Sequence, residues 1–249
     1  MKSDSIIIKK RYDRIAPFFD LLEAPMEGLF FRRWRKRLWQ KATGHHILEV
    51  GVGTGKSFDF YPNDARITAI DFSPEMLKQA GRNSIRKNIT VDLCLMDVQS
   101  LCYADNSFDT VIGSFVFCSV PMPVKGLKEL YRVCKPGGQV LLLEHVISSK
   151  PWQAKIMNLL NPAVVKLFGA NINRDTVKNV KFCGFSSVRI DNRCGDLLKL
   201  IEAVKWRSTT SLDSRLWKWY ETKYRTLTSN QKLLKQPVKS GKMTTILYN

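Results

Sequence analysis

Strand-like and helix-like segments alternate through residues 46–204, and this alternation is the feature that most restricts the fold of the chain. Short apolar runs, bounded by glycine, proline or aspartate, are followed by stretches of helical periodicity. Strands that alternate with helices form a parallel sheet with helices on both faces. We therefore expect an α/β fold with a doubly wound, mostly parallel seven-stranded sheet and an antiparallel last strand. The expected strands are 46–50, 66–70, 89–96, 108–116, 139–144, 186–193 and 197–204, with helices at 73–77, 127–134 and 177–183.

Acidic residues stand at the ends of four of the expected strands. They are Glu49, Asp71, Asp97 and Glu144. In doubly wound sheets the ligand crevice lies at the carboxyl ends of the strands. These side chains are therefore expected to gather around one crevice.

A glycine-rich turn follows the first strand and reads Glu49-Val-Gly51-Val-Gly53-Thr-Gly55-Lys-Ser57. A phosphate-binding P-loop would need glycine where Val50 stands. A nicotinamide dinucleotide site would need its third glycine one residue later than Gly55. An acidic residue followed by glycines at every second position fits throughout, and glycine lets the backbone approach a ligand closely.

Four further segments accompany this turn in a fixed order: Ala69–Leu77, Met96-Asp97, Ser107–Ile112 and Arg132–Gly138. Together with the glycine turn they resemble the five ordered motifs of class I methyltransferases dependent on S-adenosylmethionine (SAM). The resemblance covers roughly residues 10–204. It implies the Rossmann-like methyltransferase fold and SAM as the cofactor.

The resemblance also implies which residues hold the cofactor. Gly51, Gly53 and Gly55 are expected against the methionine part of SAM, with Glu49 near its ammonium group. Asp71 is expected to accept hydrogen bonds from both ribose hydroxyls, because a carboxylate offers two acceptor oxygens. The remaining candidates for cofactor contact are Phe72, Met76, Asp97, Val98 and Ser114.

Methyl transfer needs alignment and exclusion of water more than acid–base chemistry, so acceptor residues are harder to identify. The apolar segment Ser114–Val120 favours a greasy acceptor over a flipped base. His145, at the end of the fifth strand, is a candidate for orienting or deprotonating the acceptor, or else a structural histidine. Trp152, Met157 and Phe168 are candidates for lining the acceptor pocket, although packing would explain them equally well.

The segment Tyr12–Asp20 is similar to the lid of one methyltransferase branch, which contains ubiquinone/menaquinone, phospholipid N- and thiol S-methyltransferases. Tyr12 in that pattern covers the cofactor and is our second catalytic candidate. Phe19 stands where the pattern usually has a second tyrosine. The resemblance continues through residues 143–176.

Residues 25–40 are predicted to form a basic amphipathic helix, with Phe30, Phe31, Trp34 and Leu38 on one face and Arg32, Arg33, Arg35, Lys36 and Arg37 on the other. Such a helix is typical of a peripheral anchor on anionic membranes. A lid helix with a solvated basic face is the alternative. Together with a net charge of +18, the pattern indicates lipid surfaces and nucleic acids as candidate partners. We consider nucleic acid the less favoured of the two.

The remaining composition bears on the location of the protein in the cell and on whether it has disulfides or a metal site. No apolar run reaches the ~20 residues of a membrane span, and the N-terminal apolar stretch is too short for a signal peptide. The six cysteines form no CxxC pair and no cluster with the three histidines, so we expect neither a disulfide scaffold nor a metal site. We expect a cytoplasmic protein that is peripheral to the membrane at most, with a lid (1–45), a SAM-binding domain (46–204) and a basic aromatic extension (205–249).

The sequence thus predicts a SAM-dependent methyltransferase whose acceptor is an amphiphile, with a phospholipid amine of the phosphatidylethanolamine type as first choice. S-methylation of a small thiol and C-methylation of a quinone precursor are alternatives within the same branch. RNA binding or RNA methylation is motivated by charge alone. A non-catalytic cofactor sensor is disfavoured by the retained Glu49, Asp71 and loop glycines.

Overall fold

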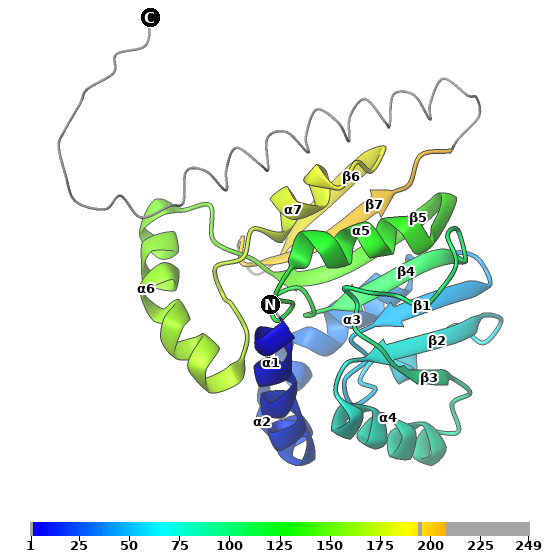
Figure 1. Ribbon diagram of the computed structural model, residues 1–249, viewed down its shortest axis with the longest axis horizontal. Helices are drawn as coiled ribbons and strands as arrows, with labels where there is room; N and C mark the ends of the chain where they lie inside the picture. The colour runs from blue at the N-terminus through cyan, green and yellow to red at the C-terminus, as the bar shows by residue number, and fades with distance from the viewer. Residues whose placement is uncertain (1, 194–195, 208–249) are drawn as a thin grey trace, which may run out of the picture. The chain divides into compact units, whose positions relative to one another are not determined.

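A seven-stranded sheet with helices on both faces forms the body of the protein (Figure 1). The computed structural model describes residues 2–193 and 196–207. The strand order is β3-β2-β1-β4-β5-β7-β6. The strands are β1 (His46–Val50), β2 (Arg66–Asp71), β3 (Asp92–Leu95), β4 (Phe108–Ser114), β5 (Cys134–His145), β6 (Ser187–Arg193) and β7 (Leu198–Val204).

Strand pairing confirms the predicted sheet. Strands β1 to β5 pair in parallel, and β7 runs antiparallel to both of its neighbours, β5 and β6. Three expected boundaries were wrong. Strand β3 is shorter than 89–96, the fifth helix begins at Pro123 and not at Leu127, and β5 begins at Cys134 and not at Gln139. The Lys135–Gly138 segment therefore enters the sheet, where the register between β4 and β5 shifts next to Phe108.

The helices are α1 (Lys2–Ile15), α2 (Phe19–Met26), α3 (Arg32–Trp39), α4 (Pro74–Lys87), α5 (Pro123–Val133), α6 (Pro151–Phe168) and α7 (Thr176–Phe182). Local chemistry explains the bounds of α4. The hydroxyl of Ser73 accepts from the Met76 N–H, Pro74 occupies the first turn, and Asn88 ends the helix in the left-handed region.

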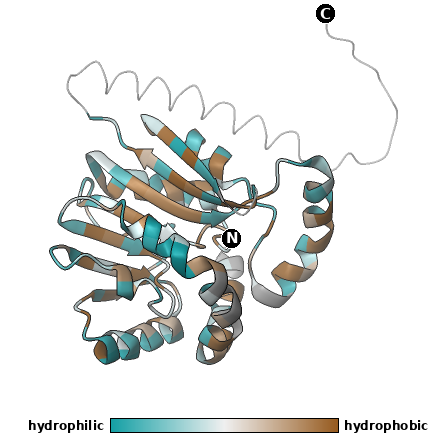
Figure 2. Ribbon diagram, turned by 180° about the vertical axis from the view of Figure 1, so that it is seen from behind, coloured by the Kyte–Doolittle hydropathy of each residue, from teal (hydrophilic) through white to brown (hydrophobic). Residues whose placement is uncertain are grey.

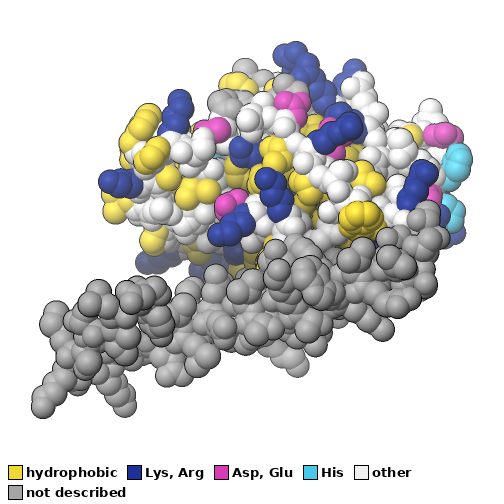
Figure 3. Space-filling view, turned by 90° about the horizontal axis from the view of Figure 1, so that it is seen from above, with side chains coloured by type: hydrophobic (Ala, Val, Ile, Leu, Met, Phe, Trp, Pro, Cys, Tyr) yellow, Lys and Arg dark blue, Asp and Glu magenta, His cyan; other side chains and the backbone are white. Residues whose placement is uncertain are grey.

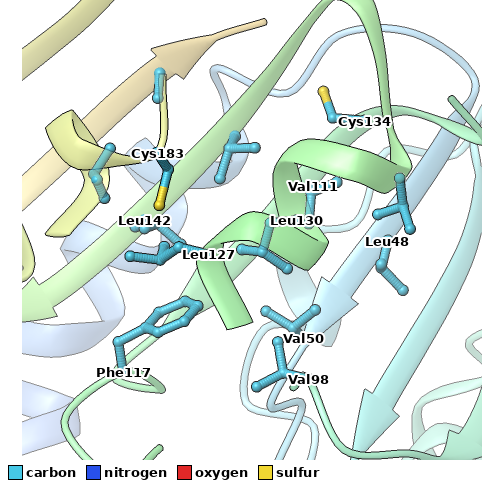
Figure 4. Packing of buried hydrophobic residues seen from close by; sticks show 14 of the residues in the cluster. Leu48, Val50, Val98, Val111, Phe117, Leu127, Leu130, Cys134, Leu142 and Cys183 are labelled. Atoms are coloured by element: carbon cyan, nitrogen blue, oxygen red, sulfur yellow. The ribbon is translucent and has the colours of Figure 1, made fainter. Parts of the chain in front are cut away.

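Alternating side chains of the central strands fill two apolar layers. Leu48, Val111 and Leu142 pack with α5 and α7 on one face, as Figure 4 shows for part of this layer. Their neighbours Ile47 and Leu141 pack with α3 on the other face. This period of two is what a sheet covered on both sides requires.

The N-terminal segment does not form the single amphipathic helix expected over 25–40. Helix α2 ends at Met26, a π-helical turn spans Glu27–Phe31, and α3 begins at Arg32. The expected basic face is also wrong in one position, because Arg35 is buried with only 7% of its surface exposed. Its guanidinium pairs with Glu27 at 3.2 Å, which compensates for its loss of water.

The described residues contain no helix that is long and apolar enough to cross a membrane. The expected C-terminal extension falls almost entirely outside them, since only residues 205–207 of it are described. Lys205 directly follows β7, and its ammonium donates to the carbonyl of Cys134 at 2.8 Å.

Core packing around β5 gives a stability test. Leu142 is completely buried at the centre of the sheet, so Leu142→Ala is expected to lower the free energy of unfolding by about 3 kcal/mol. Leu95→Ala is the matched control, because Leu95 is 57% exposed at the sheet edge, and its effect should stay within about 0.5 kcal/mol. Urea unfolding followed by circular dichroism measures both, and equal losses would contradict this description of the core.

Candidate functional site

A cavity of about 340 Å³ opens at the carboxyl ends of β1, β2 and β4. This size suits a small organic ligand. Nine of the twelve predicted site residues line it: Tyr12, Gly51, Gly53, Asp71, Phe72, Met76, Asp97, Val98 and Ser114. The N-terminal helices supply part of the wall, which includes Ser5, Ile15, Phe19, Phe31 and Arg35.

The glycine turn leaves open space where a ligand would lie. Gly51 and Gly53 have φ angles of +65° and +57°, in the left-handed region that disfavours side chains. A Cβ added to Gly51 would meet Val116 at 2.6 Å, whereas one added to Gly53 would meet nothing within 4 Å. Gly53 therefore faces the cavity with bare backbone.

Asp71 ends β2 and is fixed by two backbone amides. One carboxylate oxygen accepts from the Gly53 N–H and the other from the Ser73 N–H, each at 2.9 Å. Each oxygen keeps a further lone pair for a ligand hydroxyl. The side chain thus joins the glycine turn, the start of α4 and the cavity.

One end of the cavity is suited to a flat ring. Phe72 and Met76 line it beside Asp97, and Tyr12 meets Phe72 edge-on with ring centroids 5.6 Å apart. The carboxylate of Asp97 accepts from the Gln99 backbone N–H at 2.8 Å and from the Gln99 side-chain amide. Asp97 is therefore held in place at the rim.

Ser114, in the cavity wall, has an unpartnered hydroxyl, whereas Glu144, near the wall, holds the backbone of the wall in place. Ser114 Oγ is buried and has no hydrogen-bond partner among the described residues, which is what a ligand group would satisfy. Glu144 Oε1 accepts from the N–H groups of Val116 and Phe117 at 3.0 and 3.1 Å and so holds the turn after β4.

Arg35 is a pocket residue that the sequence pattern assigned to the solvated face. Its guanidinium carbon lies 5.2 Å from the centroid of the Phe115 ring, which itself stacks 4.5 Å from Phe31. A cation buried among aromatic rings gains from their quadrupoles. Helical periodicity could not reveal this placement because the helix breaks at Glu27–Phe31.

Three predicted site residues lie outside the lining. Glu49 is buried and accepts a short hydrogen bond from the Tyr61 hydroxyl, and Gly55 packs against the Phe58 ring. His145 is also absent from the lining. Burial lowers its pKa, and a hydrogen bond to the Ile172 backbone opposes that shift. The geometry therefore does not support a role for His145 in orienting or deprotonating the methyl acceptor.

Trp152 and Met157, candidates either for lining the acceptor pocket or for packing, do not line the cavity. Trp152 is 61% exposed, and Met157 is buried against the backbone of Ser148 instead of lining the cavity. The side chain of Phe168 lies outside the described residues.

Burial raises the pKa of the carboxyl groups around the cavity. The pKa of Glu49 and that of Glu144 are each raised to about 7, and the pKa of Asp71 to about 6, with loss of water as the largest cause in every case. The hydrogen bond from Tyr61 opposes the pKa shift of Glu49. Hydrogen bonds from backbone amides, including that of Ser73, oppose the pKa shifts of Asp71 and Glu144. A cationic ligand at this site would favour the ionised forms.

Comparisons with known proteins agree with this geometry. A family model described as a methyltransferase domain matches residues 48–142. Phosphatidylethanolamine N-methyltransferase from Cereibacter sphaeroides is 39% identical over 111 residues, which cover 44% of this chain and 55% of that protein. A human thiol S-methyltransferase is 32% identical over 154 residues, covering 59% of this chain and 62% of that protein. The chain thus spans less than two thirds of these two relatives.

A longer match comes from demethylmenaquinone methyltransferase of Clavibacter sepedonicus. It is 30% identical over 197 residues, which cover 68% of this chain and 80% of that protein. A solved SAM-dependent methyltransferase from Thermotoga maritima has the same fold, with a TM-score of 0.60 at 18% identity over 80% of this chain and 99% of that one.

The strand order and the glycine turn define a Rossmann-like protein with its ligand crevice at the carboxyl ends of the strands. The chain belongs to the class I SAM-dependent methyltransferases, the family predicted from its motifs. The cofactor of this family is S-adenosylmethionine. The open backbone at Gly53, the acceptor oxygens of Asp71 and the orphaned Ser114 Oγ fit such a nucleoside.

Removal of the Asp71 charge tests the site. Asp71→Asn is expected to weaken SAM binding by about 10- to 100-fold, because one carboxylate oxygen becomes an amide that cannot accept from a ribose hydroxyl. Isothermal titration calorimetry gives the affinity, and urea unfolding reports whether the glycine turn survives. Asp92→Asn is the control, since Asp92 pairs with Arg66 on the exposed sheet edge. Unchanged affinity in a folded Asp71→Asn variant would refute the assignment.

Stability should depend on pH through Glu144. Its pKa is raised from 4.5 to about 7 by burial, so between these values the native state binds more protons than the unfolded chain. The stability contributed by this group is therefore present below about pH 4.5 and is lost as the pH rises through 7. Glu144→Gln keeps an acceptor for the Val116 and Phe117 amides. It should flatten the decline in the urea midpoint between pH 5 and pH 7.5, and a decline as steep as in the wild type would disprove the role of Glu144.

Proposed function

We propose that the protein transfers a methyl group from SAM to an amphiphilic acceptor at a membrane surface, and that this acceptor is a phospholipid amine of the phosphatidylethanolamine type. The similarity to a phosphatidylethanolamine N-methyltransferase supports this choice. The observation that carries it is the guanidinium of Arg35 beside the apolar part of the cavity wall.

Beyond the residues assigned to the cofactor, the cavity is lined mainly by hydrocarbon. Ile15, Phe19 and Phe31 come from the N-terminal segment, and Phe115 and Pro121 follow β4. Such a wall favours an acceptor with apolar character. Buried Arg35, whose Nε pairs with Glu27, has guanidinium N–H groups of the kind that bind a headgroup phosphate beside its amine.

The cofactor, when bound, supplies an activated methyl group, and this chain has to align the acceptor and exclude water. We propose residues 1–45 as the lid. Hydrogen bonds from the lid to the body support this role: Tyr12 Oη lies 2.6 Å from Ser119 Oγ, and Asp20 accepts from the Thr54 hydroxyl at 2.6 Å.

Tyr12 is our proposed catalytic residue, because it lines the cavity and meets Phe72 edge-on, next to the part of the wall that we assign to the cofactor. It would orient the acceptor nitrogen by a hydrogen bond shared with Ser119. Glu49, behind the turn, would stabilise the ammonium of the cofactor through the field of its carboxylate.

Thiol and quinone acceptors are favoured by their own relatives. Both are amphiphilic, so the apolar wall alone does not separate them from a lipid amine. The acceptor assay below distinguishes all three.

The proposed reaction is tested with radiolabelled SAM and a panel of acceptors. In mixed micelles, phosphatidylethanolamine should accept label at least about tenfold faster than a hydrophobic thiol, a demethylated quinone or RNA, because only the lipid offers an amine beside phosphate. Asp71→Asn should lose this transfer and Asp92→Asn should retain it. Label appearing only in the thiol or only in the quinone would overturn the proposed acceptor and leave the family assignment intact.

A further inference from the structure

Helix α6 carries an apolar stripe that no other described part of the protein covers. Trp152, Ile156, Leu159 and Leu160 are 61%, 48%, 79% and 50% exposed. Their spacing of i, i+4, i+7 and i+8 places them on one side of the helix. In Figure 2, α6 is brown over much of its length.

The opposite side of α6 is attached to the protein. Met157 is buried and receives a hydrogen bond from the Ser148 N–H, and the Asn161 side chain joins the loop after the helix through Asn171 and Ile172. The helix is therefore held firmly, and the exposed stripe is not the inner face of a detached segment.

The charges on α6 itself have one sign. The helix contains no Asp or Glu, and Lys150, Lys155 and Lys166 are exposed along it. One carboxylate, that of Asp196, lies near its start, where it accepts from the hydroxyls of Ser148 and Ser149. Figure 3 shows yellow side chains interrupted by dark blue ones at the left end of the molecule, where Figure 1 places α6.

The C-terminal end of α6, on the same helix as the stripe, adjoins the cavity. Gly169 caps α6, and the next residue, Ala170, lines the cavity. Helix α1 lies beside this end, because Arg11 donates to the Val165 carbonyl and Tyr12 approaches Gly169. Figures 1 and 2 both show α1 and α6 side by side.

We propose that the exposed face of α6 inserts into the interfacial layer of an anionic membrane and brings the cavity mouth to the acceptor. A row of Trp, Ile and Leu on a helix whose own charges are all lysine is suited to acyl chains below and lipid phosphates around it. A second copy of this chain is a poorer occupant, because two-fold pairing would bring the lysines against each other. The consequence for catalysis rests on the proposed function, but the surface can be tested without it.

The test measures partitioning of the full chain onto vesicles of phosphatidylethanolamine and phosphatidylglycerol in equal parts. Trp152→Ser combined with Leu159→Ser should lower the partition coefficient by about tenfold or more, because both side chains lose their burial in lipid. Ile85→Ser combined with Leu95→Ser is the matched control. These residues are 83% and 57% exposed on α4 and β3, and their replacement should change partitioning less than twofold.

Two further measurements keep the outcomes separate. SAM affinity by calorimetry should be the same in all variants, which shows that the α6 variant is folded. Leu159→Glu alone should weaken binding to the anionic vesicles as well. Equal partitioning of the wild type and the α6 variants would refute the proposal. The proposal would also be refuted if light scattering showed a dimeric wild type and a monomeric Trp152/Leu159 variant, because the exposed face of α6 would then join two copies of the chain.

The panel assay distinguishes failure here from failure of the proposed function. If phosphatidylethanolamine in micelles is methylated but the α6 variants bind vesicles as the wild type does, only the proposed membrane-binding surface is overturned. Vesicle binding that depends on α6, with label found only in a thiol, overturns only the acceptor.

Discussion

The carboxylate of Asp71 is the contact on which the arrangement of the site depends. It stands at the end of β2 and accepts from one amide of the glycine turn and one amide at the start of α4. Because both amides donate to one carboxylate, this buried acceptor fixes the two segments relative to each other. The cavity floor therefore has its shape before any ligand arrives.

The N-terminal segment joins this floor through polar contacts. Ser73, whose amide donates to Asp71, also donates its hydroxyl to Asp13 of α1 at 2.5 Å. The same serine thus caps α4, positions Asp71 and anchors α1. Removal of the Ser73 hydroxyl would disturb the cap of α4 and the anchor of α1 at once, which distinguishes it from an ordinary capping residue.

The sequence was sufficient for the sheet and for most of the cavity floor. Period-two apolar runs such as Ile47–Val50 identify covered strands, and the loop glycines and strand-end carboxylates belong to motifs that are local in the chain. Glu49 and His145 were assigned to the site because they stand at strand ends. Whether such a side chain faces the cavity or the core depends on the twist of the strand and on the conformation of the turn that follows it. The wall supplied by the lid could not be predicted because Arg35 faces inward only after the π-helical turn at Glu27–Phe31 shifts the helix register. Trp152 was a candidate for lining the pocket or for packing, and it does neither, because nothing in the local pattern distinguishes an exposed apolar stripe from a buried one.

The position of α1 and α3 in the cavity wall has a kinetic meaning. Tyr12, Ile15, Phe31 and Arg35 line the same cavity as Gly53 and Asp71. Movement of this wall would break the Tyr12–Ser119 and Asp13–Ser73 hydrogen bonds. With the nucleoside in the proposed site, its departure would be coupled to opening of the N-terminal segment, and the rate of each catalytic cycle would then depend on how often these two bonds part.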